Sequence, residues 1–267
     1  MRCSVNIAFY NNIGNLKLIL AGLESQTVKD FEVVICDDGS REDVVNQIKE
    51  IQKTSPLSIC HIWQEDNGWQ KNIILNKSIM SMKTDYIIFI DGDCIPDTRF
   101  VEAHLEVREK GFAMTGRRIN LSDKISKKLT PEMVKKGYFN KNFLYLLLSG
   151  ETRHGEKMLY ARIPFLARMV NKKHKDILGC NFSIYKQDLL AINGFDERFL
   201  FPGIGEDADI YRRLRMIGKS TKSVVASALV YHLYHKETII PQAAWDLQQL
   251  TFEENESFTP YGIIKKS

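Results

Sequence analysis

The sequence predicts an α/β fold with a Rossmann-like, mostly parallel central sheet and helices on both faces. Two observations predict this class. Stretches of strand length alternate four times with stretches of helical apolar spacing before residue 97. The last of them, residues 85–96, reads Asp-Tyr-Ile-Ile-Phe-Ile-Asp-Gly-Asp-Cys-Ile-Pro, and its five adjacent apolar residues are typical of a strand buried on both faces. Such alternation produces parallel strands joined by right-handed crossovers.

The expected elements follow in order along the chain. The strands are Ser4 to Phe9, Phe31 to Cys36, Leu57 to Trp63 and the stretch that starts at Asp85. The helices between them are Leu16 to Leu23, Glu42 to Lys53 and Trp69 to Met82. Ser40 is the expected N-cap of the second helix. A later helix follows residue 205, because Ile210, Leu214 and Ile217 recur at helical spacing.

Two of the strands end in carboxylates. Asp37 and Asp38 end the second strand, and Asp91 and Asp93 follow the fourth with Gly92 between them. Ligands bind at the carboxyl ends of strands in open α/β sheets. Mg²⁺ and Mn²⁺ usually take one or two carboxylates from the protein and the remaining ligands from phosphates and water. The Asp-X-Asp motif therefore predicts a metal–diphosphate site, and an ordinary Asp-Gly turn is the alternative.

Composition excludes several classes of protein. The 267 residues are 44% hydrophobic and 26% charged, which is ordinary for a globular chain. The five cysteines lack a Cys-X-X-Cys spacing and no charged-then-apolar leader opens the chain, so we expect a cytoplasmic protein without disulfides or zinc. No apolar run reaches the roughly 20 residues that span a bilayer. The absence of Gly-X-Gly-X-X-Gly after the first strand and of any P-loop argues against dinucleotide oxidoreductases and P-loop ATPases.

Eight short motifs lie in a consistent order along the chain. They are Tyr10-Asn11, Asp37 to Ser40, Gln64 to Lys77, Phe89 to Pro96, Gly179 to Ser183, Asn193 to Asp196, Gly205 to Asp209 and Val230 to His235. In this order and spacing they resemble family 2 glycosyltransferases of the GT-A fold, closest to the chondroitin-polymerase and galactosyltransferase-like members. The match is collinear over about residues 3–236.

The resemblance implies one fused GT-A domain with four parts. Residues 1–118 are expected to form the nucleotide-sugar-binding half, 119–176 a basic helical insertion, 177–240 the acceptor-binding and catalytic half, and 241–267 a helical C-terminal tail.

The basic insertion departs from the rest of the chain. Residues 122–175 hold ten Lys and three Arg against four acids, in a chain whose net charge is +4. Apolar clusters at 143–148 and 160–170 lie among these charges. Three readings stay open: helices that cover the acceptor side, an amphipathic patch in peripheral contact with a membrane, or a solvated insertion with a small satellite core. We expect no nucleic-acid partner, because no recognised binding module accompanies the charge.

The resemblance also implies the nucleotide contacts. Asp38 matches the residue that hydrogen-bonds uracil, Tyr10 the residue that packs on the base, and Asp91 a residue that supports the metal or contacts the ribose. Asn67 and Lys71 lie in the segment that approaches the diphosphate. Many relatives carry Arg where this chain has Gln70, so a cationic contact is either missing here or supplied by Lys71. The alternative for Asp38 and its neighbour Asp37 is a structural turn and helix cap.

Metal binding and catalysis are implied in the same way. Asp93 is the expected direct ligand, with His232 completing the coordination and His235 as a second choice. An imidazole beside carboxylates favours Mn²⁺ over Mg²⁺. Asp207 matches the general base, and Glu206 is expected to bind the acceptor or the donor sugar. Compensation of a helix dipole is the alternative explanation for both acids.

Together these matches imply a metal-dependent inverting hexosyltransferase or N-acetylhexosaminyltransferase. It would transfer a sugar from a UDP-sugar to a glycan or lipid-linked saccharide with a β linkage, in surface polysaccharide biosynthesis at the inner face of the membrane. Two alternatives are a catalytically inactive sugar-nucleotide-binding module and a sugar-nucleotide pyrophosphorylase. The second would need a Gly-rich loop with Arg and Lys after the first strand, which is absent.

Overall fold

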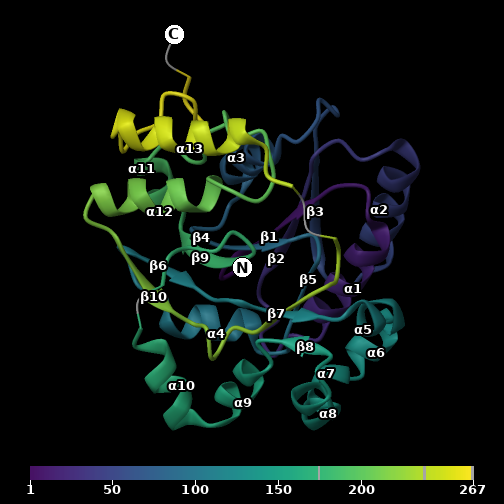
Figure 1. The fold of residues 1–267 in the computed structure, drawn as a ribbon. Coiled ribbons are helices and arrows are strands. Elements are labelled where there is room, and N and C mark those ends of the chain that lie inside the picture. The colour runs from purple at the N-terminus through teal and green to yellow at the C-terminus, as the bar shows by residue number, and fades with distance from the viewer. Residues whose placement is uncertain (174, 237–238, 266–267) are drawn as a thin grey trace.

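Two sheets form the frame of the molecule in the computed structural model, which describes residues 1–173, 175–236 and 239–265 (Figure 1). Within these residues the larger sheet has seven strands, in the order β10 (Ser220–Ser223), β6 (Phe112–Thr115), β9 (Asn181–Tyr185), β4 (Tyr86–Asp91), β1 (Ser4–Phe9), β2 (Glu32–Asp37) and β3 (Ser58–Trp63). β9 is antiparallel to its neighbours β4 and β6, and the other pairs are parallel. The smaller sheet has the order β5 (Cys94–Pro96), β11 (Val230–His232), β7 (Arg118–Leu121) and β8 (Thr152–Arg153).

Helices cover both faces of the larger sheet, because its strands alternate their apolar side chains between two cores. Ile88 and Ile90 of β4 pack into one core, while Ile87 and Phe89 pack into the other. The first core receives α1 (Ile13–Glu24), α2 (Glu42–Thr54) and α4 (Phe100–Val107). The second receives α3 (Lys71–Ser81), α11 (Lys186–Ala191) and α12 (Glu206–Met216). The predicted fold class is thereby confirmed.

One local prediction needs correction, and one is confirmed. Ser40 does not cap α2: the N-cap is Arg41, without a side-chain cap bond, and the Ser40 hydroxyl accepts the N–H of Asn11 at 2.7 Å instead. The strand that starts near Asp85 does end at the Asp-Gly-Asp sequence, since β4 ends at Asp91 and β5 belongs to the smaller sheet. Gly92 permits this turn, since a Cβ there would lie 2.6 Å from the carbonyl oxygen of Ala8.

The expected basic insertion consists mainly of short helices. They are α5 (Asp123–Lys128), α6 (Pro131–Lys135), α7 (Tyr138–Lys141), α8 (Phe143–Leu148), α9 (Glu156–Arg162) and α10 (Pro164–Asn171). Buried side chains of this segment, including Ile125, Phe139 and Met158, join the first core of the large sheet, so they do not form a separate satellite core. The functional division of the chain at residues 118, 176 and 240 stays a prediction.

The C-terminal segment carries α13 (Gln242–Glu254), a helix where the sequence predicted one. Figure 1 shows α12 and α13 at the top of the molecule and α8, α9 and α10 at the bottom. Among the helices in the described ranges, none combines the length and the apolar character that crossing a membrane requires.

Candidate active site

One cavity of about 720 Å³ collects side chains from distant parts of the chain. Its wall is formed by the carboxyl ends of β1, β2 and β4, the start of α12 and the end of β11. The predicted site residues that line it are Tyr10, Asp38, Lys71, Asp91, Asp93, Glu206, Asp207, His232 and His235. Asn67 is exposed and is not among the lining residues, and its nucleotide role stays a prediction.

A carboxylate and two imidazoles form a compact donor set in the cavity wall. The Nε2 atoms of His232 and His235 each lie 3.3 Å from Oδ2 of Asp93, and 3.3 Å from one another. One donor atom from each of the three residues lies within 4.8 Å of the others. One oxygen and two imidazole nitrogens fit a divalent cation such as Mn²⁺.

Strand pairing brings these three residues together. His232 lies opposite Cys94 in the antiparallel pair of β11 with β5, and Asp93 directly precedes β5. The backbone N–H of Leu233 also donates to the carbonyl of Asp93 at 2.9 Å. Both histidines are thereby held against the turn that carries the Asp-X-Asp motif.

Electrostatics favour the ionised carboxylate here. Burial acts to raise the pKa of Asp93, but hydrogen bonds from His232 and His235 hold that pKa well below its usual range. Asp93 in turn raises the pKa of His235 to about 9, mainly through their hydrogen bond. The negative charge needed for a cation ligand is therefore present at neutral pH.

Lys71 links the acids of two separate motifs. Its Nζ lies 2.7 Å from Oδ1 of Asp91 and 3.6 Å from Oε1 of Glu206. Burial acts to lower the pKa of Lys71, but these carboxylates hold it above its usual range, whereas burial raises the pKa of Glu206. Lys71 therefore compensates the charge of the end of β4 and of the start of α12 simultaneously.

The first turn of α12 directs its three acids differently. Gly205 has φ of 100°, and a Cβ there would lie 2.1 Å from the Phe199 ring, so the tight entry to the helix needs glycine. Asp207 faces the cavity, where its Oδ2 accepts the N–H of Gly179 at 3.2 Å. Asp209 is buried and pairs with Arg213 at 2.7 Å and Arg212 at 3.2 Å. This last acid is structural, because its charge is neutralised inside the protein.

The turn after β2 forms another part of the cavity wall. Asp38 accepts from Nε2 of Gln64 at 2.6 Å and from the N–H of Gln70 at 2.7 Å, and burial raises its pKa. Tyr10 is 49% exposed and donates to Oδ2 of Asp66 at 2.9 Å. An acidic group beside an exposed aromatic ring can recognise a base.

Asp37 does not line the cavity. Its Oδ2 lies 2.8 Å from Nε2 of His61, and its Oδ1 accepts the N–H of Ser40 at 2.8 Å. The turn explanation therefore suits Asp37, whereas Asp38 faces the site.

Two charged cavity residues, Arg118 and Asp66, were not among the predicted site residues, although Asp66 lies within the Gln64 to Lys77 motif. Arg118 reaches the cavity because β7 pairs with β11 in a register that places Arg118 opposite Val230. Asp66 reaches it because the loop before α3 folds over the turn after β2, where it accepts from Tyr10. Both positions depend on contacts between segments far apart in the chain.

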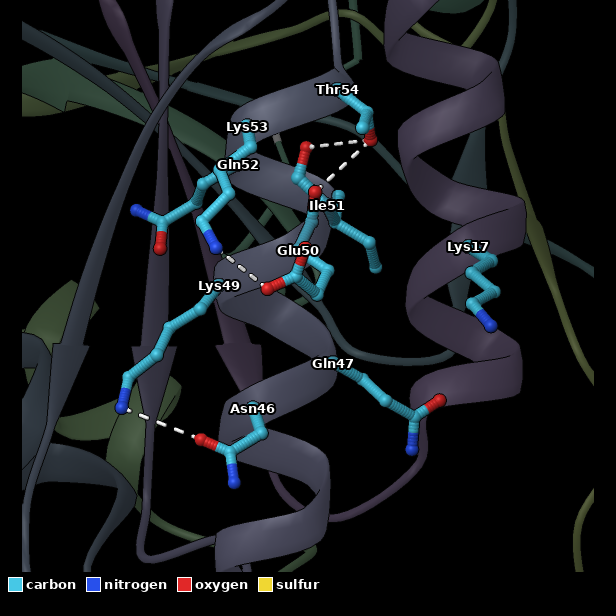
Figure 2. Close-up of a pocket in the computed structure, with 9 residues that line it drawn as sticks. All are labelled: Lys17, Asn46, Gln47, Lys49, Glu50, Ile51, Gln52, Lys53 and Thr54. Carbon is cyan, nitrogen blue, oxygen red and sulfur yellow. Dashed lines mark hydrogen bonds and ion pairs between the residues drawn. The ribbon is translucent and has the colours of Figure 1, made fainter.

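A second hollow of about 810 Å³ lies along α2 and is lined by that helix and Lys17 (Figure 2). Its one acid, Glu50, pairs with Lys53 at 2.7 Å. Figure 2 shows side chains that bond mainly within the helix, so we assign no chemistry to this hollow.

Comparisons with known proteins show that this chain is similar to glycosyltransferases. Residues 4–180 match the model of glycosyl transferase family 2, and residues 167–236 match that of the N-terminal domain of galactosyltransferase. Chondroitin synthase of Escherichia coli is 28% identical over 279 residues, which cover 98% of this chain and 39% of the relative. Chondroitin synthase of Pasteurella multocida (strain Pm70) is 25% identical over 245 residues, covering 86% of this chain and 24% of the relative. The chain thus spans well under half the length of these relatives.

Solved glycosyltransferases share the fold at low sequence identity. TarS of S. aureus has a TM-score of 0.60 at 15% identity, covering 95% of this chain and 39% of its own. GalNAc-T7, solved with UDP, GalNAc and Mn²⁺, has a TM-score of 0.59 at 14% identity, covering 89% of this chain and 44% of its own. Both likenesses support the GT-A fold. Because the family model matches most of the sequence, the chain belongs to glycosyl transferase family 2.

Proposed function

We propose that the protein is a metal-dependent inverting glycosyltransferase that transfers a hexose or N-acetylhexosamine from a UDP-sugar to a saccharide or lipid-linked saccharide. One observation carries the proposal. A single cavity is lined by Asp38 and Tyr10, by the donor set around Asp93, and by Glu206 and Asp207. A sugar nucleotide has a base, a diphosphate and a sugar, and these three groups would suit them in turn.

The cation would be held by Asp93 with His232 and His235, with Asp91 supporting it or contacting the ribose. When bound, a divalent cation such as Mn²⁺ neutralises negative charge on the diphosphate leaving group. Lys71 orients Asp91 through their 2.7 Å ion pair. Because that lysine is already paired with two carboxylates, it adds little free positive charge for the diphosphate.

Asp207 is the proposed general base. Its carboxylate accepts the proton of the acceptor hydroxyl while the hydroxyl oxygen forms its bond to the anomeric carbon and the bond to UDP breaks on the opposite face. The N–H of Gly179, 3.2 Å from Oδ2, holds the carboxylate in place. Glu206 binds the acceptor or the donor sugar. Inversion of an α-linked donor yields a β linkage.

The donor base and the biological setting follow from the same site and from the relatives. Asp38 can accept the imide N–H of uracil, which supports UDP. Similarity to two chondroitin synthases supports a role in surface polysaccharide biosynthesis. All five cysteines are free thiols, which supports a reducing, cytoplasmic compartment.

The experiment is a mass-spectrometric screen of UDP-sugars with oligosaccharide and lipid-linked acceptors, with and without Mn²⁺. We expect Mn²⁺-dependent transfer and slow donor hydrolysis. Binding of UDP without turnover on any acceptor would instead support the inactive binding module. Formation of a UDP-sugar from UTP and a sugar phosphate would support the pyrophosphorylase.

A further inference from the structure

Helices α8 and α10 expose apolar side chains that folded proteins usually bury. Only Leu146 is buried in α8, and no residue is buried in α10. The most exposed apolar side chains of the two helices are Leu144 (65%), Leu148 (79%), Phe165 (68%) and Met169 (52%). We call these four residues and the helix surfaces that carry them the basal face. Large exposed apolar surface marks an interaction site.

The two halves of the basal face belong to one unit. α9 packs against both α8 and α10, and the guanidinium of Arg162 lies 4.0 Å from the ring centre of Phe143. Figure 1 shows α8, α9 and α10 together at the bottom of the molecule. The exposed side chains therefore lie along one end of the protein.

Positive charge surrounds this face without matching acids. Between residues 141 and 173 the chain has seven Lys and Arg but two Glu. Glu151 pairs with Lys124 at 2.8 Å, and Glu156 lies 3.8 Å from His154. Within the described ranges, no carboxylate lies within 4.0 Å of the exposed cations Lys141, Arg168, Lys172 and Lys173.

The spacing in α10 suits a helix that lies in the plane of an interface. Phe165 and Met169 are four residues apart, as are Arg168 and Lys172, so an apolar row and a cationic row run side by side. Interfacial helices bury such an apolar row at the headgroup boundary and direct the cations at anionic lipids. A lipid surface supplies diffuse negative charge, so it needs no individually matched carboxylates.

We propose that the basal face docks on an anionic lipid bilayer, with its apolar side chains in the headgroup boundary and its cations against the lipid phosphates. The proposal is independent of the chemistry in the cavity, since none of these residues lines it. Docking through this face leaves α13, at the opposite end of Figure 1, directed away from the bilayer.

Co-sedimentation with vesicles tests the proposal on the full chain. We expect binding to vesicles of phosphatidylcholine with phosphatidylglycerol, and release at 1 M salt, where the screening length is about 3 Å. Phe165→Ser and Leu148→Ser should each weaken binding about tenfold, because each removes a large apolar side chain from the boundary. Arg168→Gln and Lys172→Gln should each weaken it about fivefold, and only on the anionic vesicles.

The matched controls are Trp245→Ser and Leu250→Ser on α13, which are 48% and 45% exposed at the opposite end of the molecule. They should bind vesicles like the parent protein. Absence of binding at low salt, or equal losses in the α13 controls, would overturn the proposal. The proposal would also be overturned if the protein did not bind vesicles but self-associated, and if Phe165→Ser abolished that self-association. The basal face would then bind a second copy of the chain.

Discussion

Asp207 and Asp209 are two residues apart in the first turn of α12 and differ in every contact. The first faces the cavity and accepts a backbone N–H, whereas the second is buried against Arg212 and Arg213. A general base must reach solvent or substrate, and a neutralised buried acid cannot act as one. The two positions therefore provide an internal comparison between catalysis and structure.

Asp207→Asn should lower transfer by about 10²–10⁴-fold, because it removes the proton acceptor while keeping size. Donor binding and the melting temperature should hardly change. If the acid only compensates the helix dipole, the loss would instead be about 0.3–1 kcal/mol of stability with turnover intact. Steady-state kinetics and thermal unfolding of the same preparation distinguish the outcomes.

Asp209→Asn is the structural counterpart. It leaves the Arg213 guanidinium buried without its carboxylate, which should cost about 3–5 kcal/mol of unfolding free energy. Urea denaturation measures this change. Equal stability of the Asp207 and Asp209 variants would contradict the assignment.

Asp93→Ala should abolish Mn²⁺-dependent UDP-sugar binding, because it removes the carboxylate of the donor set and leaves only the two imidazoles of His232 and His235. Calorimetry with Mn²⁺ measures the loss, and unchanged donor affinity would disprove the metal assignment. A second readout needs no metal: the pKa of His235 should fall from about 9 towards its usual 6.5, since the hydrogen bond that its ring donates to Asp93 is the main cause of the shift. NMR titration follows this change.

At the scale of elements, a buried polar chain joins α4 to β9. His104 Nδ1 lies 2.7 Å from Oγ of Ser183, and its Nε2 lies 3.1 Å from Oδ1 of Asn181. Tyr86 Oη, from β4, lies 2.7 Å from the same Ser183 hydroxyl. Asn181 also donates to the carbonyls of Arg117 and Ala228, so this network ties β9 to the loops beside the cavity.

Burial lowers the pKa of His104 from 6.5 to about 4, although its bond to Asn181 opposes the shift. Between these pH values His104 binds a proton in the unfolded chain but not in the folded protein. The stabilisation that follows from neutral His104 is therefore fully present above pH 6.5 and is lost as the pH falls towards 4. The loss should be about 3 kcal/mol. Urea denaturation of the parent protein and of His104→Gln should show this pH dependence only in the parent. The same pH dependence in both proteins would contradict the prediction.

At the scale of the whole molecule, the basic helices are part of the main core. Phe139 of α7 stacks on Tyr231 of β11 with ring centres 3.7 Å apart, directly beside His232. The insertion therefore supports the smaller sheet from the side opposite the cavity. Its charge is local, but its apolar side chains belong to the first core of the large sheet.

Phe139→Ala should cost about 3–5 kcal/mol of stability, because it opens a cavity in the shared core. It should also weaken Mn²⁺ binding, since Tyr231 precedes His232. Phe165→Ala in α10 is the matched control and should change stability by less than about 0.5 kcal/mol, because that ring is 68% exposed. Urea denaturation measures the free energy of unfolding of both variants. Equal values for Phe139→Ala and Phe165→Ala would show that the insertion folds separately from the large sheet.

Much of the fold and part of the site could be predicted from local pattern. The alternation of Ile87 to Ile90 between two cores produces a central strand with helices on both faces. Asp91 and Asp93 end that strand because a glycine permits the turn. Residues whose position depends on their neighbours in the chain, such as Asp38 after β2, could therefore be predicted from the sequence.

The sequence by itself determined the fold class, the family and which residue types meet at the carboxyl end of the sheet. Only the tertiary structure decided that Asp209 pairs with buried arginine, that Ser40 binds Asn11 instead of capping α2, that both histidines lie against Asp93, and that Arg118 reaches the cavity. The physical reason is the range of the interactions. Periodicity and turns depend on neighbours in the chain, whereas these side chains are positioned by strand register and ion pairs between segments far apart in sequence.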